Sequence, residues 1–176
     1  MPIQRPSNFK KWITESFRNS LILDKEKFLA RYSGIAELNV DYCLDMFDEA
    51  IQTRDAEMVD EAMLLTEFLK LFSAKFSSLL CELLQADWHY KHEDIATELK
   101  LIKDSSTVDC LFNATQLNFD YLNYDDTYQF ARKCIKAISE INNEEAIGKL
   151  KILAKTDNLE IREYSIKELR YKGLAN

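Results

Sequence analysis

The chain has 176 residues, 47% of them apolar and 30% charged, and a net charge of −7 at neutral pH. This apolar fraction supports a packed core and excludes intrinsic disorder as a description of most of the chain. Three glycines and two prolines, both prolines close to the N-terminus, exclude a fold built from tight β-turns. The sequence therefore predicts an all-α fold.

Apolar residues recur at helical spacing along the N-terminal half of the chain. Short polar side chains cap the free amide groups of a first helical turn, so residues of this type mark where helices begin. Five helix starts are predicted on this basis, at Ser7 or Asn8, Asp24, Asn39 or Asp41, Asp55 and Ser73. The first of these helices carries Phe9 and Phe17, and the second carries Phe28 and Tyr32.

Two internal self-matches follow a polar hinge at residues 87–92. Residues 98–109, ELKLIKDSSTVD, resemble residues 149–160, KLKILAKTDNLE. A second match has an offset of 31 residues, aligning Asp126 with Asp157 and Phe130 with Ile161. Self-similarity of this length predicts stacked helix pairs that share one core.

Residues 157–169, DNLEIREYSIKEL, resemble the second-helix signature of HEAT-like repeats. The resemblance covers roughly residues 92–172 and implies an α-α superhelix of stacked antiparallel helix pairs, with Asp157 and Arg162 supporting the turn. The usual proline of the family is Asn158 here, and its arginine is Leu111 or Ala131 in the earlier copies. We expect a helical region over 1–90, with the degree of repeat left open, and HEAT-like repeats over 91–176, together forming one continuous unit.

Acidic residues concentrate in the middle of the chain. Residues 34–131 have a net charge of −14, whereas residues 1–33 have +4 and residues 132–176 have +3. A first acidic cluster lies at residues 41–61. Within it, Asp45, Asp48 and Glu49 are spaced to share one helical face, where like charges repel. The cluster is a candidate partner-binding face, with an ordinary solvated face as the alternative.

A second acidic cluster, at residues 118–128, interleaves tyrosines with aspartates. Its candidate binding residues are Asp120, Tyr121, Tyr124, Asp125 and Asp126. Tyrosine is enriched among interface hot spots, and aspartates beside it would attract a basic partner. The alternative is that the aromatic residues pack inward and that Asp125 or Asp126 only caps a helix.

Residue types that perform catalysis or hold cofactors are sparse. The two histidines, His89 and His92, could form a metal site with Glu93 and Asp94, but the spacing does not match a helical metal motif. We expect a surface hinge with incidental histidines, no metal and no cofactor. Three isolated glycines cannot form a phosphate-binding loop, and the acidic middle disfavours nucleic acid. The chain is not expected to be an enzyme.

The four cysteines, at positions 43, 81, 110 and 134, lie within apolar helical patterns. We expect buried free thiols in a reducing cytoplasm, with zinc binding or a disulfide as alternatives. The sequence also contains no apolar run of signal-peptide or membrane-spanning length. A cytoplasmic location without a membrane partner is therefore expected.

Two functional hypotheses remain alongside the disfavoured enzyme. One is a bacterial immunity protein that neutralises a basic, nuclease-type toxin through an acidic surface, since such inhibitors are similar in size and charge. The other is a general helical-repeat adaptor that binds the helix or tail of a partner along a groove. Both hypotheses make the chain a protein-binding molecule.

Overall fold

The computed structural model describes residues 39–122 and 128–175, and all regular elements in these ranges are helices. The all-α prediction is confirmed. The chain divides into two compact units, residues 1–71 and residues 72–176, by the contacts between its residues. The helices predicted to begin near Ser7 and Asp24 lie outside the described residues.

Helices α3 (Val40–Thr53) and α4 (Ala56–Leu69) form the described part of the first unit and pack against each other. The predicted caps are confirmed, because Asn39 accepts a hydrogen bond from the amide of Tyr42 and Asp55 accepts one from the amide of Met58. The apolar faces form the packed interior, with Cys43, Met46, Phe47, Ala50, Met58, Val59, Ala62, Met63, Leu65 and Leu69 buried.

The second unit contains nine helical segments among its described residues. They are η1 (Ala74–Phe76), α5 (Ser77–Gln85), α6 (His92–Ile102), η2 (Ser105–Thr107), α7 (Val108–Ala114), η3 (Asp120–Leu122), α8 (Gln129–Ile141), α9 (Glu144–Leu153) and α10 (Leu159–Tyr171). The start predicted at Ser73 is confirmed in position, although the first turn is 3₁₀ and the Ser73 side chain makes no cap hydrogen bond.

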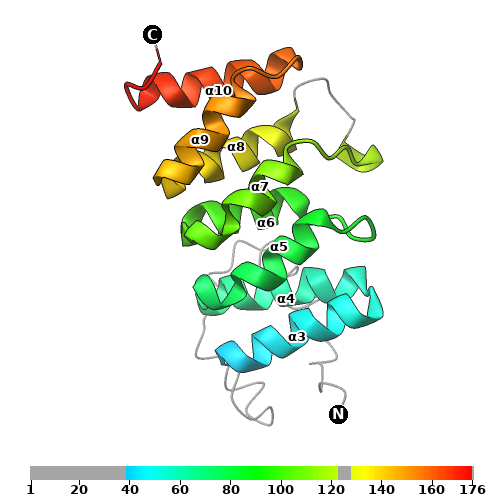
Figure 1. The fold of residues 1–176 in the computed structure, drawn as a ribbon. Coiled ribbons are helices and arrows are strands. Elements are labelled where there is room, and N and C mark those ends of the chain that lie inside the picture. Colours follow the sequence, from blue (N-terminus) through cyan, green and yellow to red (C-terminus); the bar gives the residue numbers. More distant parts are fainter. Residues whose placement is uncertain (1–38, 123–127, 176) are drawn as a thin grey trace, which may run out of the picture. The chain divides into compact units, whose positions relative to one another are not determined.

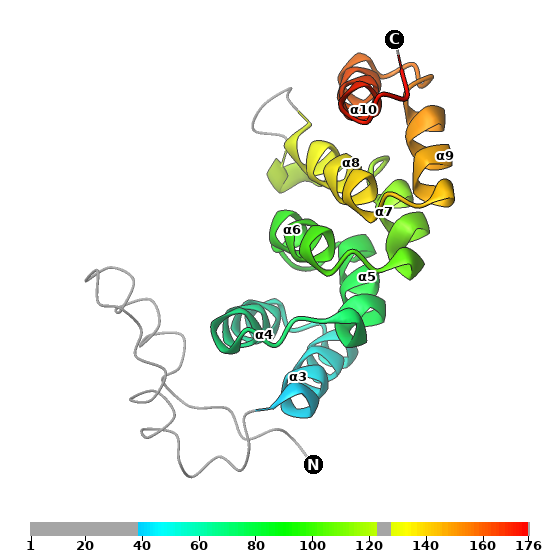
Figure 2. The same ribbon diagram turned by 90° about the vertical axis from the view of Figure 1, so that its left-hand side faces the viewer.

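These segments pack in two layers. Helix α8 lies between α6 and α10 in one layer, and α7 lies between α5 and α9 in the other, as the two views of the second unit show (Figures 1 and 2). The two helices of each successive pair also contact each other across the layers, as α5 does with α6, α7 with α8 and α9 with α10. The residues between the layers form the core and include Leu80, Leu84, Ile95, Leu99, Val108, Leu111, Ile135, Ile138, Leu150 and Leu169.

The two self-matches differ in how they relate to this packing. The match with an offset of 31 aligns the sequence of α8 with that of α10, and these helices pack side by side in the same layer. The match between residues 98–109 and 149–160 relates the end of α6 to the end of α9, and these helices belong to different layers. Only the match with an offset of 31 residues therefore relates equivalent helices.

The turn before α10 is supported by two side chains. Arg162 donates from Nη1 to the Thr156 carbonyl over 3.3 Å, as expected for its role in the turn. The helix cap is Asn158, which accepts from the amide of Ile161, and the neighbouring Asp157 is exposed. The sequence assigned turn support to Asp157, whereas the capping oxygen comes from the next residue.

Cys81 of α5 and Cys110 of α7 form a disulfide, with 5.7 Å between their Cα atoms. The prediction of free thiols is wrong for this pair, because the packing of two helices in one layer brings together cysteines that are 29 residues apart. It is confirmed for Cys43 and Cys134, which are buried and unpaired. No helix in the described ranges is long and apolar enough to cross a membrane.

Candidate protein-binding site

The predicted site residues lie in two separate units. Asp45 and Asp48 are exposed on α3 and Glu49 is half-buried, all in the first unit. Asp120 is exposed and Tyr121 is half-buried in η3 of the second unit. Tyr124, Asp125 and Asp126 lie outside the described residues.

The acidic face of α3 is the solvent side of an amphipathic helix. Asp41, Asp45 and Asp48 are all exposed, while the opposite side of the helix contacts α4 through Cys43 and Phe47. No aromatic side chain is exposed on α3, so this face presents charge without apolar contact area. The geometry favours the solvated-face interpretation for this cluster.

The turn between α5 and α6 contains both histidines, and both are buried. His89 is 1% exposed and His92, the first residue of α6, is 0% exposed. The imidazole rings stack with their centroids 4.2 Å apart and an interplanar angle of 11°. The expectation of incidental surface histidines is wrong, because the turn folds back over the end of α5 and covers both rings.

Hydrogen bonds determine which nitrogen of each imidazole carries the proton. In both rings Nε2 donates to a main-chain carbonyl, that of Leu83 at 2.8 Å from His89 and that of Ala86 at 2.6 Å from His92. Nδ1 of His89 accepts from the amide of Lys91 at 3.0 Å. Both rings are therefore neutral Nε2–H tautomers, which suits a buried site where an imidazolium would be costly.

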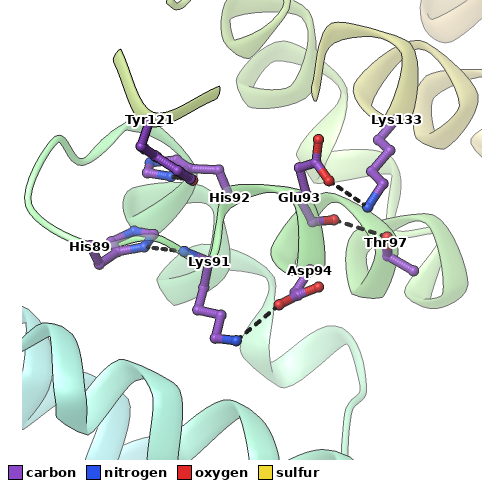
Figure 3. A network of polar contacts seen from close by, with 8 residues as sticks. All are labelled: His89, Lys91, His92, Glu93, Asp94, Thr97, Tyr121 and Lys133. Atoms are coloured by element: carbon purple, nitrogen blue, oxygen red, sulfur yellow. Dashed lines mark hydrogen bonds and ion pairs between the residues drawn. The ribbon is translucent and has the colours of Figure 1, made fainter. Parts of the chain in front are cut away.

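The remaining nitrogen of His92 connects this turn to the second predicted cluster. Its Nδ1 lies 2.6 Å from the Tyr121 hydroxyl, which donates to it, and Figure 3 shows the two side chains next to each other. The His92 ring also packs 3.8 Å from the Phe119 ring, centroid to centroid, and Phe119 lies 5.7 Å from Phe130 of α8. These contacts fix the segment that contains Phe119 and Tyr121 onto the start of α6.

Burial sets the protonation of this pair. It lowers the pKa of His92 to about 4, with a further contribution from neighbouring His89, so His92 is neutral at neutral pH. Burial raises the pKa of Tyr121 to about 12, and the carboxylates of Glu93 and Asp94 act in the same direction. Tyr121 therefore remains protonated and serves as the donor to His92.

Two ion pairs lie at the first turn of α6, next to the hydrogen bond between His92 and Tyr121. Glu93 pairs with Lys133 of α8 over 3.0 Å, and Asp94 pairs with Lys91 over 3.2 Å (Figure 3). Glu93 Oε1 is buried and has no hydrogen-bond partner in the part of the chain that the structure describes. Carboxylates at a helix N-terminus also interact favourably with the helix dipole, which compensates in part for this burial.

An exposed tyrosine packs against the half-buried ring of Tyr121. The Tyr90 side chain is 69% exposed, and its ring packs edge-on against Tyr121 with 5.1 Å between centroids. Exposed Asp94 interacts electrostatically with Tyr121, and exposed Asp120 immediately precedes Tyr121 in the chain. We call these four residues, Tyr90, Tyr121, Asp94 and Asp120, the tyrosine–acid patch.

Comparison of the chain with protein-family models, with curated proteins and with solved structures finds no match. The patch must therefore be interpreted from its own geometry. The described residues contain no group of three or more His, Cys, Asp or Glu side chains placed to hold a metal ion.

Sequence reasoning proposed Asp120 and Tyr121 as binding residues but did not propose Tyr90 or Asp94 for that role. It treated residues 87–92 as a hinge, although the string Trp88-His89-Tyr90 is unusually aromatic for a solvated turn. That density of rings is the signal that could have identified the turn as part of a packed surface.

Proposed function

We propose that this chain is a non-catalytic protein-binding module that captures a basic partner through the tyrosine–acid patch. The observation that carries the proposal is Tyr90, an exposed ring fixed against Tyr121, whose hydroxyl is bound to buried His92. A preorganised tyrosine gives a partner a large contact area at little entropic cost. Solvated helical faces do not provide such an anchor.

Charge supports a basic partner. The patch combines the two rings with Asp120 and with Asp94, whose carboxylate also pairs with Lys91, within a stretch of the chain whose net charge is −14 over residues 34–131. Acidic groups around an aromatic anchor accelerate encounter with a positively charged surface and discriminate against acidic proteins. The affinity is then expected to weaken as salt concentration rises.

The partner that this charge pattern fits best is a nuclease-type toxin domain, which must be basic to bind nucleic acid. The chain would then act as a bacterial immunity protein whose acidic surface competes with the nucleic acid substrate. A cytoplasmic location belongs to this proposal. The Cys81–Cys110 disulfide weighs against a reducing compartment, because structural disulfides are rare in the cytosol.

The test uses the product of the neighbouring gene as the partner. Purified full-length chain and that protein are mixed, and both binding and nuclease inhibition are measured at low and at physiological salt. Tyr90→Ala is expected to weaken binding roughly thirtyfold, as for a hot-spot residue. Asp120→Lys is expected to slow association, because it reverses a steering charge.

Glu163→Lys provides the matched charge-reversal control, because Glu163 is exposed on α10, outside the patch. This control is expected to change binding less than twofold, roughly the effect of a distant rim charge. Equal losses for Glu163→Lys and Asp120→Lys would remove the patch from the proposal. A nuclease that is bound but not inhibited would contradict the immunity role while leaving the protein-binding role intact.

A second candidate function is a HEAT-like adaptor that binds the helix or tail of a partner. It is favoured by the layer formed by α6, α8 and α10, because stacked helices of this kind offer an extended surface. The internal match that aligns the sequences of α8 and α10 also supports repeat character. Binding that survives Tyr90→Ala but fails on substitutions along α8 and α10 would favour this adaptor role.

A further inference from the structure

The layer that contains α8 and α10 has a small hollow between these two helices. It has a volume of about 100 Å³ and is lined by Arg132, Ile135, Lys136, Tyr164, Lys167 and Glu168. A drug-sized ligand or cofactor needs a pocket of about 300–1,000 Å³. The hollow is therefore sized for one charged side-chain group and not for a whole metabolite.

The lining is strongly basic in a chain that is acidic as a whole. Three of the six lining residues are cationic, and Glu168 is the only acidic one. Lys136 and Lys167 are exposed and form no ion pair with any residue in the described ranges. Their ammonium groups are therefore available to an anion that enters the hollow.

Arg132, the third cationic residue of the hollow, is held in a fixed orientation. Its guanidinium lies over the ring of Tyr164 at 5.4 Å from the centroid, and its Nη1 donates to Gln129 Oε1 over 3.5 Å. Arginine presents a planar fork of donors that matches the geometry of a carboxylate or phosphoryl group. The ring of Tyr164 and the buried side chain of Ile135 provide apolar surface for the carbon atoms that carry such a group.

We propose that the hollow between α8 and α10 is a binding site for a peptide side chain that ends in an oxyanion, a carboxylate or a phosphoryl group. Arg132 binds the oxyanion directly, while Lys136 and Lys167 neutralise its charge. A nucleic acid is a poorer occupant, because a hollow of about 100 Å³ accommodates one oxyanion on a flexible side chain and not a continuous phosphate backbone. The site is opposite in charge to the tyrosine–acid patch and does not depend on it.

The binding experiment uses fluorescence anisotropy with the full-length chain. The probes are fluorescein-labelled hexaglutamate, a hexapeptide alternating phosphoserine with glycine, hexalysine and a hexathymidylate oligonucleotide. We expect both acidic peptides to bind and hexalysine not to bind through the hollow. The stronger of the two acidic peptides identifies whether the oxyanion is carboxylate or phosphoryl.

Two pairs of substitutions, matched in charge, test whether the hollow is the binding site. The double variant Lys136→Gln, Lys167→Gln is expected to lower the affinity for the preferred peptide roughly tenfold, as for loss of charged hydrogen bonds. The control is Lys151→Gln, Lys155→Gln, at exposed positions on α9 and the turn after it, and is expected to change affinity less than twofold. Circular dichroism melting shows whether each variant remains folded.

Several outcomes would overturn the proposal. Equal losses in the two double variants would indicate non-specific attraction to charge. Oligonucleotide binding as tight as that of the peptides would make the site a polyanion surface, and an absence of peptide binding at millimolar concentration would exclude it. Salt-sensitive self-association that Lys136→Gln, Lys167→Gln abolishes would identify the occupant as a second copy of this chain.

Discussion

Two acidic regions of the molecule, the face of α3 and the tyrosine–acid patch, have similar charge but different construction. On α3, Asp45 and Asp48 extend into solvent from a helix whose opposite side is buried. In the patch, exposed Asp94 and Asp120 accompany two packed tyrosine rings, of which Tyr121 donates a hydrogen bond to buried His92. Charge spacing alone therefore does not distinguish a helix face that presents only carboxylates from a surface where aromatic side chains are also packed in a fixed orientation.

The difference extends to what each region depends on. The α3 face depends on little beyond its own helix, since its carboxylates are exposed and lie outside the apolar contact between α3 and α4. The patch depends on contacts between segments far apart in the chain, because His92 and Tyr121 are separated by 29 residues. We therefore expect the two regions to respond very differently to substitution and pH.

The largest expected effect comes from the disulfide that joins α5, the helix before the histidine turn, to α7. Cys81→Ala, Cys110→Ala should lower the free energy of unfolding by roughly 3–4 kcal/mol, because the bond closes a loop of 29 residues in the unfolded chain. Urea unfolding followed by Trp88 fluorescence in a Trp12→Phe background measures this loss. Reductant should destabilise the parent chain and leave the double variant unchanged.

A parent chain whose unfolding ignores reductant would show that the bond does not form. Thiol titration of the denatured, unreduced chain gives an independent check, because only Cys43 and Cys134 are free. The α3 face lies in the other unit, so fraying of α3 and α4 by hydrogen exchange is expected to be insensitive to this change.

Acid should weaken the patch more than the α3 face. The pKa of His92 is lowered from 6.5 to about 4 by burial, so neutral His92 stabilises the fold above pH 6.5. That contribution is lost as the pH falls from 6.5 toward 4 and amounts to about 3 kcal/mol in full. The measurement is the unfolding free energy across this pH range for the parent chain and for His92→Gln.

His92→Gln retains an amide donor for the Ala86 carbonyl but cannot titrate, so its stability should fall less steeply over the same pH range. Parallel pH profiles for the two proteins would show that His92 titrates normally. Tyr121→Phe serves as the companion variant, because it removes the donor to Nδ1 and is expected to raise the pKa of His92.

The smallest expected effect belongs to α3 and has the opposite sign. Asp45→Asn removes repulsion with Asp41, Asp48 and Glu49 and should stabilise the chain by about 0.5 kcal/mol at low salt. Thermal melts at low and high ionic strength measure it, and the gain should fade with added salt. A loss of stability would show that the Asp45 carboxylate makes a favourable contact and that this face is not simply solvated.

Local chemistry made several features predictable. The caps Asn39 and Asp55 were identified correctly because an N-cap needs only a short polar side chain next to its own helix. The match between α8 and α10 was identified because equivalent helices repeat the same apolar spacing. The contact between α5 and α6 across the histidine turn, in contrast, leaves no composition signal in the sequence.

Half of the patch could not be predicted for the same kind of reason. Tyr90 packs against Tyr121, and Phe119 packs against the ring of buried His92. These pairs depend on the path of the chain between α7 and α8, which sequence spacing does not specify. The hollow beside Arg132 likewise exists only because α10 packs against α8.

The sequence by itself determined the all-α fold, the capped helix starts and the acidic middle of the chain, because each depends on neighbouring residues or on composition. Only the tertiary structure decided which charges surround a fixed aromatic anchor, which cysteines pair and where a basic hollow opens. The reason is physical: burial, ring stacking and disulfide formation require atoms from distant segments to meet. Helical periodicity predicts which face of a helix is apolar, but it does not predict which helix covers that face.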